Sequence, residues 1–243
     1  MKEISRGELH LYPAAREELE TNLDRFYAAL VPAEKKQAKR LIIPEKKEQF
    51  ILGRGFLRSL LAAYTGFKPG ELALSSDENG KPFLVNSRIE FNLSHSHEQY
   101  LVGVTCSTPL GVDVQQLYQL TNPEFLTKKY FSPGEIDTLP ERTDEGYLEA
   151  FFTCWVRKEA YLKGLGFGLR KNPSRITLIA STTGTSQPLS EQPLPRDPGG
   201  WKILDIDSPP GYKAAAAVRF PDPRVQVITL PEVFNILDPF IDS

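Results

Sequence analysis

The spacing of apolar residues changes at Pro69, and this change limits the folds that the chain can adopt. Before Pro69, apolar residues recur at spacings of three and four, whereas after it short apolar runs alternate with turn residues. The first spacing is typical of amphipathic helices, and short runs bounded by turns are typical of strands. The sequence therefore predicts a mixed fold in which helices come first, followed by strands, with helices and strands alternating again in the second half.

Three helices are predicted before Pro69, at Arg16–Leu30, Pro32–Ile43 and Glu45–Tyr64. Gly66 is a suitable C-cap for the last of them, because glycine adopts the left-handed conformation that ends many helices. Lys47, Arg54 and Arg58 lie near one another on this helix. They predict a basic edge that is separate from its apolar stripe.

Strands are predicted at Pro82–Val85, Ile89–Leu93, Tyr100–Cys106, Gly111–Val114, Arg175–Ala180, Trp201–Ile206 and Ala214–Arg219. The short connection through Ser107–Leu110 predicts that the two strands beside it form a hairpin. Tyr147–Lys163 is the strongest helical pattern of the second half, and 123–143 is helical in part. Ser181–Gly200 is rich in Ser, Thr, Pro and Gly, which indicates an exposed loop.

Charge and composition exclude several classes of protein. The 243 residues carry 29 Lys and Arg against 31 Asp and Glu, a formal net charge of -2, so there is no global field for nucleic acid or an anionic membrane. Met1–Pro13 lacks the apolar stretch of a signal peptide, which predicts a cytoplasmic protein. Cys106 and Cys154 have no metal-ligand spacing and indicate core thiols rather than a zinc site.

Two of three distinctive segments carry carboxylates. In Gly111–Gln115 the strand period of two places Asp113 and Gln115 on one face, which taken alone indicates either a solvated face or a metal ligand. In the helix, Glu159 and Lys163 share a face with Trp155. By itself this spacing is typical of an exposed ion pair beside a core tryptophan.

The third segment is Phe91-Asn92-Leu93-Ser94-His95-Ser96, in which His95 and its two flanking serines are predicted to form a loop after the strand Ile89–Leu93. Its imidazole and hydroxyls either hydrogen-bond within their own loop or hold a phosphate. The lysines at positions 35, 36, 39, 46 and 47 taken alone indicate a solvated helical face.

Taken together, the three segments and the basic residues say more about function than each does alone. Carboxylates on two different elements can hold Mg²⁺, which completes its octahedron with water and substrate phosphate oxygens. Basic residues around such an ion would hold the remaining phosphates. The set as a whole indicates phosphoryl chemistry, in which positioning and charge neutralisation supply most of the catalysis.

The order FNLSHS, GVDVQ and WVRKEAYLK resembles the motifs (F)NxSHS, GxDxE and WxxKEAxxK of the Sfp-type 4′-phosphopantetheinyl transferases. The resemblance extends to the Gly80–Pro82 turn and to Gly166–Leu169. It implies that the protein transfers phosphopantetheine from coenzyme A to a serine of an apo acyl or peptidyl carrier protein, with Mg²⁺, and releases adenosine 3′,5′-bisphosphate. Carriers of fatty-acid, polyketide and nonribosomal-peptide synthesis are all possible partners.

The resemblance also implies roles for individual residues. Asp113 and Glu159 would bind Mg²⁺, with Gln115 or a water at the next position. Glu159 would accept the serine proton, while Lys163 and Lys158 would act at the diphosphate. The nucleotide end of coenzyme A would be held by a third group of residues, namely Ser94, His95, Lys81, Arg54, Lys35 or Lys36, and Lys39.

Gln115 departs from the family pattern, which commonly has a second carboxylate there. A neutral amide is a weaker ligand for a hard cation, so we expect weaker metal binding. The departure leaves open a module that binds a carrier or coenzyme A with little catalysis. A metal-dependent phosphohydrolase would use the same carboxylates.

The fold that the resemblance implies is α+β, with two similar subdomains related by a pseudo-two-fold axis, each a small antiparallel sheet packed with helices. The expected division places the nucleotide grip in residues 1–108 and the metal and catalytic helix in residues 109–243. Because both subdomains lie in one chain, we expect a monomer.

Overall fold

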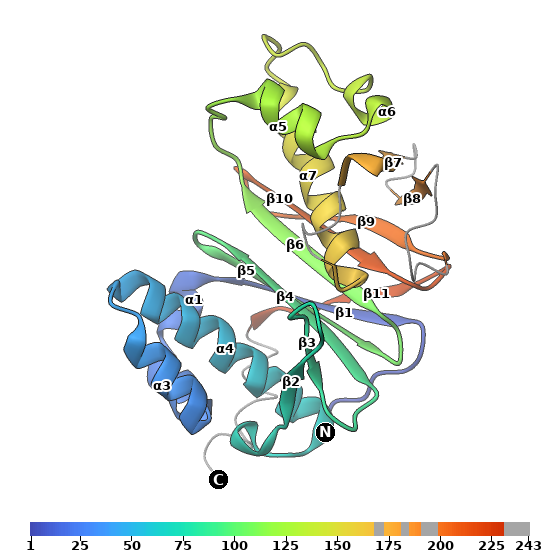
Figure 1. Cartoon of the computed structure of the whole chain (residues 1–243). Helices are drawn as coiled ribbons and strands as arrows, with labels where there is room; N and C mark the ends of the chain where they lie inside the picture. The colour runs from blue at the N-terminus through green and yellow to red at the C-terminus, as the bar shows by residue number, and fades with distance from the viewer. Residues whose placement is uncertain (168–172, 181–184, 191–198, 231–243) are drawn as a thin grey trace.

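The computed structural model describes residues 1–167, 173–180, 185–190 and 199–230, and it has an α+β fold (Figure 1). The α-helices of these residues are α1 (Arg16–Glu20), α2 (Leu23–Ala29), α3 (Pro32–Arg40), α4 (Pro44–Thr65), α5 (Pro123–Tyr130), α6 (Pro133–Ile136) and α7 (Tyr147–Gly164). The strands are β1 (Glu8–Ala15), β2 (Leu74–Ser76), β3 (Pro82–Leu84), β4 (Ile89–Ser96), β5 (Gln99–Cys106), β6 (Leu110–Gln116), β7 (Ile176–Ala180), β8 (Thr185–Ser190), β9 (Lys202–Ile206), β10 (Tyr212–Val218) and β11 (Arg224–Val227).

Two sheets carry the fold. The first has the order β11-β1-β5-β4 and the second the order β6-β10-β9-β8-β7, while β2 and β3 form a separate two-stranded ribbon. In chain order, the first strand of each half, β1 or β6, is followed by helices. A strand near the end of the same half then pairs antiparallel with it: β5 with β1, and β10 with β6. The order β1-β5-β4 in the first sheet thus corresponds to the order β6-β10-β9 in the second, although the first sheet also contains β11 from the second half of the chain. The division at residue 108 stays a prediction.

Helices cover the outer faces of the two sheets (Figure 1). Helix α4 packs on the first sheet in a core that includes Phe56 and Val102, and α7 packs on the second in a core that includes Leu162 and Ile203. A further core lies where the sheets meet and contains leucines and valines of β1, β5, β6 and β10. This layering brings β4, at the edge of the first sheet, against β6, at the edge of the second.

Helix α4 begins and ends as its sequence dictates. Pro44 occupies its first turn, where a missing N–H costs no hydrogen bond, and Gly66 ends it in the left-handed conformation with φ 74°. The predicted basic edge is wrong at Arg58, which is 2% exposed and buried beneath the helix. Its guanidinium binds Glu34 and the carbonyls of Pro69 and Leu72 instead.

Two predictions from local patterns are corrected. The segment 16–30 is two helices rather than one, because the backbone leaves the helical conformation at Asn22, between α1 and α2. The predicted hairpin of β5 and β6 is also wrong. Strand β5 pairs with β1 and β4, while β6 crosses to the second sheet and pairs with β10.

Strands β1 and β11 were not predicted, and they pair in parallel from Glu8 with Arg224 to Leu11 with Val227. The predicted loop Ser181–Gly200 contains β8, which pairs with β7 and β9. The rest of that stretch, except residues 199 and 200, lies outside the described residues, as does part of Gly166–Leu169. None of the helices in the described ranges is both long and apolar enough to cross a membrane.

A buried polar network joins β1 to α4. The Nδ1 atom of His10 lies 2.6 Å from the Tyr64 hydroxyl, which also hydrogen-bonds the hydroxyl of Tyr12. The pKa of His10 is lowered from 6.5 to about 4, mainly by burial and also by the charge of Lys2, while Glu8 opposes both effects. His10 is therefore neutral in the folded protein near pH 6, while it is partly protonated in the unfolded chain.

We predict that folding stability falls as pH falls below about 6.5, because between the unfolded and folded pKa values the unfolded state binds the additional proton. The slope from this one group is at most about 1.4 kcal/mol per pH unit. In His10→Asn, the part of the slope due to this residue should disappear in urea unfolding measured between pH 7.5 and 4.5. His97→Asn, at an exposed position, is the control and should keep the wild-type slope; an unchanged slope in His10→Asn would refute the prediction.

Candidate active site

The two sheets are joined by hydrogen bonds between side chains of β4 and the backbone of β6. Three buried polar side chains point from alternate positions of β4, and each accepts a bond from a backbone N–H of β6. The bonds run from Val112 N to Asn92 Oδ1 (2.8 Å), from Val114 N to Ser94 Oγ (3.3 Å) and from Gln116 N to Ser96 Oγ (3.1 Å). These side chains take the place of a strand ladder and fix the register of β6 against β4.

Asp113 lies within this junction, on β6, and is 5% exposed. Its Oδ1 accepts a hydrogen bond from Ser94 Oγ at 2.8 Å and forms an ion pair with Lys163 Nζ at 2.6 Å. The lysine also donates to Ser94 Oγ at 3.0 Å and to Val112 O at 3.3 Å. The strand carboxylate and the helix lysine predicted from separate motifs therefore meet. The solvated strand face considered for Asp113 is not observed.

Helix α7 approaches β6 closely enough to bring Glu159 to the same place. Gly111 permits this approach, because a Cβ atom there would lie 2.1 Å from the carbonyl oxygen of Ala160. The pKa of Glu159 is raised to about 7, mainly by burial and also by the neighbouring charge of Asp113, while Lys163 opposes both effects. The two carboxylates thus interact electrostatically, as groups of one site do.

One oxygen of each carboxylate has no protein partner. Among the described residues, Asp113 Oδ2 and Glu159 Oε1 are buried side-chain oxygens without a hydrogen bond. A buried acceptor left in this state costs free energy unless a ligand, ion or water satisfies it. The chemistry of this donor pair, two carboxylate oxygens, matches a hard cation. No cluster of three or more His, Cys, Asp or Glu side chains suited to a metal is present in the described ranges.

Gln115 lies on the same face of β6 but its amide nitrogen is engaged. It donates to Ser96 Oγ at 3.0 Å and to the carbonyl of Gln116 at 3.3 Å. These bonds orient the side chain and leave its amide oxygen as the atom that is available to a ligand. The direction of the amide is thus set by the same serine that binds the backbone of β6.

Ser94 and His95 belong to strand β4 rather than to the predicted loop, so they point to opposite faces. Ser94 is occupied by Asp113 and Lys163, whereas His95 packs beside Tyr100 with ring centroids 5.6 Å apart and contacts Gln49 Nε2 through Nδ1 at 3.2 Å. The pKa of His95 is lowered mainly because neighbouring side chains partly exclude water from the ring, and also by the charges of Lys163 and Lys46, although the residue itself is exposed. The structure places only the imidazole, not the hydroxyl of Ser94, where it is free to meet a ligand.

Lys81, from the Gly80–Pro82 turn, reaches across to the second half. Its Nζ donates to the carbonyl of Leu110 at 2.9 Å and to that of Gly164 at 3.0 Å. It therefore joins the start of β6 to the end of α7, and burial lowers its pKa to about 8. In this structure its ammonium binds protein carbonyls rather than lying with Ser94.

Lys158 is not part of the cluster, although it adjoins Glu159 in sequence. Its side chain is buried on another face of α7, where Nζ forms an ion pair with Glu135 at 2.8 Å and donates to the carbonyls of Pro173 and Ile176. Glu135 also accepts hydrogen bonds from the backbone N–H groups of Ser132 and Leu178. The expected role of Lys158 at the diphosphate therefore has no support in its position, which instead fixes α7 to α6 and β7.

The expected nucleotide grip is also different in detail. Arg54 Nε forms an ion pair with Glu34 at 2.5 Å, and Arg58 Nε binds the other oxygen of the same carboxylate at 2.6 Å. Lys35 donates to the carbonyl of Ala28 at 3.3 Å, with its ammonium 5.4 Å from the ring centroid of Tyr27. Lys36 and Lys39 are exposed on α3.

Sequence reasoning singled out the segment that contains Asn92 and Ser96 but not their role in joining the sheets, and it missed Glu34 and Glu135. For the first two a signal was present, since polar residues alternate with apolar ones along β4 and predict one polar strand face. Glu34 and Glu135 carried no such signal, because a single acid in a helical segment is ordinarily exposed.

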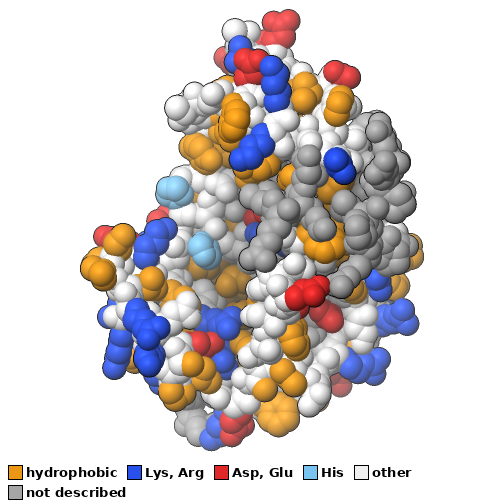
Figure 2. Space-filling view, viewed as in Figure 1, with side chains coloured by type: hydrophobic (Ala, Val, Ile, Leu, Met, Phe, Trp, Pro, Cys, Tyr) orange, Lys and Arg blue, Asp and Glu red, His pale blue; other side chains and the backbone are white. Residues whose placement is uncertain are grey.

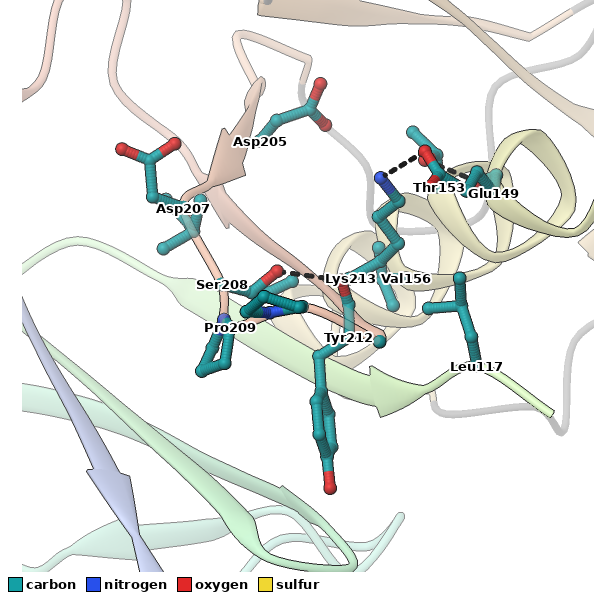
Figure 3. A pocket seen from close by; sticks show the side chains of 14 residues that line it. Leu117, Glu149, Thr153, Val156, Asp205, Asp207, Ser208, Pro209, Tyr212 and Lys213 are labelled. Atoms are coloured by element: carbon teal, nitrogen blue, oxygen red, sulfur yellow. Dashed lines mark hydrogen bonds and ion pairs between the residues drawn. The ribbon is translucent and has the colours of Figure 1, made fainter. Parts of the chain in front are cut away.

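A separate cavity of about 340 Å³ lies at the other end of α7, against the ends of β9 and β10 (Figure 3). Lys213 and Glu149 form an ion pair across it at 3.0 Å. None of the residues that line it is among the predicted site residues. The candidate site is therefore the cluster of Asp113, Glu159 and Lys163 at the junction of the sheets.

Comparison with known families shows which family the chain belongs to. The 4′-phosphopantetheinyl transferase superfamily matches residues 109–216, and the N-terminal region of a 4′-phosphopantetheinyl transferase matches residues 17–108. The chain belongs to the 4′-phosphopantetheinyl transferase family, and the resemblance to its Sfp-type members is confirmed. It is therefore a member of an enzymatic family.

Individual relatives are similar over most of their length. The 4′-phosphopantetheinyl transferase HetI of Nostoc sp. is 33% identical over 87% of this chain and 87% of its own. The 4′-phosphopantetheinyl transferase Sfp of Bacillus subtilis is 26% identical over 86% of this chain and 89% of its own. The 4′-phosphopantetheinyl transferase gsp of Aneurinibacillus migulanus is 26% identical over 96% and 95%.

We predict that Lys158→Met destabilises the protein by about 3–5 kcal/mol, because it leaves the buried Glu135 carboxylate without its cation. The double variant Lys158→Met with Glu135→Leu should recover much of this loss in urea unfolding. Lys128→Met, which breaks an ion pair whose lysine side chain is 73% exposed, is the control and should change stability little. Equal effects of Lys158→Met and Lys128→Met would show that the buried pair has no special weight.

Proposed function

We propose that this protein transfers the 4′-phosphopantetheinyl group of coenzyme A to a serine of an apo carrier protein, in a Mg²⁺-dependent reaction that releases adenosine 3′,5′-bisphosphate. Membership of the family supports phosphopantetheinyl transfer to carriers. The observation that carries the proposal is the pair of buried, unpartnered oxygens of Asp113 and Glu159 beside the ammonium of Lys163. This arrangement fits a diphosphate together with a divalent cation better than it fits a neutral substrate.

The residues of the chain have separable tasks in the reaction. The serine oxygen attacks the phosphorus that carries the pantetheine, a new P–O bond forms, and the bond to the bridging oxygen breaks. Adenosine 3′,5′-bisphosphate leaves with the electron pair. Glu159 is the group we propose to accept the serine proton, and Lys163 neutralises charge on the diphosphate. Ser94 positions the Asp113 carboxylate and the Lys163 ammonium through two of its three hydrogen bonds.

The donor set fits Mg²⁺, since this ion is commonly held by one or two protein carboxylates together with water and substrate phosphates. Asp113 and Glu159 would bind it, with the amide oxygen of Gln115 as a further ligand directly or through water. When bound, the ion supplies charge neutralisation at the diphosphate. A monomeric protein that acts in the cytoplasm remains our expectation.

The decisive test is incubation with apo carrier protein, coenzyme A and Mg²⁺, followed by mass spectrometry of the carrier. We expect a mass increase of one phosphopantetheinyl group, with an equal amount of adenosine 3′,5′-bisphosphate. Tight binding of the carrier without a mass change would indicate a binding module instead. Release of phosphate from small esters without carrier modification would indicate a phosphohydrolase. A panel of acyl and peptidyl carriers then defines the partner.

We predict that Asp113→Asn and Glu159→Gln each lower the transfer rate by about a hundredfold or more, because each removes a charge that the reacting groups need. The circular dichroism spectra should match that of the unsubstituted protein. Glu149→Gln removes an exposed acid from the same helix and is the matched control, which should retain activity. Full activity in the Asp113 or Glu159 variant would overturn the assigned roles.

We also predict that Gln115→Glu lowers the Mg²⁺ concentration needed for half-maximal activity, because a carboxylate is a stronger ligand for a hard cation than an amide. A Mg²⁺ titration at saturating coenzyme A measures the shift. Gln116→Glu, one position along on the other face of β6, is the control. An unchanged titration in Gln115→Glu would place position 115 outside the coordination sphere.

A further inference from the structure

A buried carboxylate fixes α3 to α4 in the first half of the chain. Glu34, in the first turn of α3, is 6% exposed. Its Oε1 accepts a hydrogen bond from Arg54 Nε at 2.5 Å, and its Oε2 accepts from Arg58 Nε at 2.6 Å and from the backbone N–H of Val31 at 3.2 Å. Both arginines belong to α4. One side chain of α3 therefore determines how two side chains of α4 lie.

The Glu34 carboxylate is charged although it is buried. Burial favours the neutral acid and so acts to raise the pKa, but the hydrogen bonds and charges of Arg58 and Arg54 outweigh it and hold the pKa of Glu34 below its ordinary value. Hydrogen bonds between ionised groups are shorter and stronger than those between neutral groups. The bond from Arg54 Nε to Glu34 therefore restricts the plane of the guanidinium.

The two arginines differ in the donors that they have left. Arg58 is 2% exposed, and its Nη1 donates to the carbonyls of Pro69 and Leu72. The side chain of Arg54 is 28% exposed, and in the described part of the chain Glu34 is the only group that it binds. Because Glu34 takes only Nε, the Nη1 and Nη2 end of Arg54 is unused by the described residues and is available to a ligand.

Arg54 lies on the helix that reaches the expected nucleotide end of the site. Gln49, little more than one turn before it, has Nε2 3.2 Å from Nδ1 of His95, the exposed residue of β4 that is expected to contact the nucleotide. Lys47, which is exposed, lies two turns before Arg54 on the same edge of α4. Figure 2 shows basic side chains gathered on the side of the molecule where α3 and α4 lie. The surroundings of Arg54 thus favour an anion.

We propose that Glu34 is a positioning residue for coenzyme A: it holds Arg54 by Nε and thereby directs the Nη1 and Nη2 end of the guanidinium at the 3′-phosphate of the nucleotide. This proposal rests on the proposed function. A guanidinium bound at Nε still presents two N–H groups side by side, which match two oxygens of a phosphate. We assign the 3′-phosphate because the 5′-phosphate is part of the diphosphate, which we place at Lys163.

The sign of the effect separates positioning from simple charge. Glu34 carries a negative charge close to Arg54, so if charge alone mattered, Glu34→Gln would strengthen the binding of an anion. If Glu34 holds the guanidinium in place, the same substitution weakens binding, because Arg54 must then be ordered when the ligand binds. We expect a weakening of about tenfold, the size of one charge-assisted hydrogen bond.

The test is calorimetric titration of the full chain with adenosine 3′,5′-bisphosphate, without carrier and without Mg²⁺. We expect the Kd to rise about tenfold in Glu34→Gln and in Arg54→Lys, which keeps the charge but not the fork, while the Kd for adenosine 5′-monophosphate stays unchanged. Glu124→Gln is the matched control and should keep the affinity of the unsubstituted protein. Glu124 also binds two cations, Lys128 and Arg142, but it is exposed on α5.

A double-mutant cycle tests whether Glu34 acts through Arg54 or only supports the fold. If it acts through Arg54, Glu34→Gln should weaken nucleotide binding no further in an Arg54→Met background, whereas a general effect on the fold would persist there. An equal further loss in that background would overturn the proposal, as would tighter or unchanged binding in Glu34→Gln. If circular dichroism shows that Glu34→Gln does not fold, Arg54→Met decides alone, and an unchanged Kd for the bisphosphate overturns the proposal.

Because nucleotide binding is measured without transfer, this proposal and the proposed function fail separately. If no carrier is modified but the Glu34 and Arg54 variants bind adenosine 3′,5′-bisphosphate more weakly, the positioning role stands while the activity fails. If carriers are modified and the KM for coenzyme A is unchanged in Glu34→Gln, the activity stands while the positioning role fails.

Discussion

The site depends on the way in which one strand edge is closed. Strand β6 lies at the edge of its sheet, and its outward N–H groups would be unsatisfied at the junction without partners. Side chains of β4 provide those partners, and in doing so they hold two separately formed sheets in register. Ser94 has a double task because the hydroxyl that accepts from the β6 backbone also donates to Asp113. The structural junction and the chemical site are therefore built from the same atoms.

Charge at this junction is balanced only in part. The ammonium of Lys163 neutralises the carboxylate of Asp113, but Glu159 adds a second carboxylate to the cluster. Among the residues that the structure describes, the second carboxylate has no cation of its own, and its pKa is raised. Elsewhere in the described residues, two buried carboxylates have cationic partners: Glu135 pairs with Lys158, and Glu34 pairs with two arginines. Paired buried charges of this kind hold helices in place, whereas the incompletely paired carboxylates of the cluster are available to a ligand.

Much of the fold could be predicted from local patterns, because helical spacing and strand periodicity are short-range signals. The helix that carries Glu159 and the cap at Gly66 are examples. Pairing could not be predicted in the same way: the short connection before β6 predicts a hairpin with β5, yet the strand pairs with β10, about one hundred residues later. The burial of single charged residues could not be predicted from local patterns either. Lys158 and Glu159 are neighbours in the sequence, and only the packing of α7 shows that one fixes the helix while the other faces the site.

The parallel pairing of β11 with β1 has a consequence for the order in which the chain is completed. Glu8 is bonded beside Arg224, so the outer strand of the first sheet is supplied by a segment made after nearly all of the rest. During synthesis on the ribosome, one edge of β1 has no paired strand until the second sheet and then β11 have been made. An unpaired strand edge of this kind is the part of a nascent chain that is most open to wrong pairing with another chain.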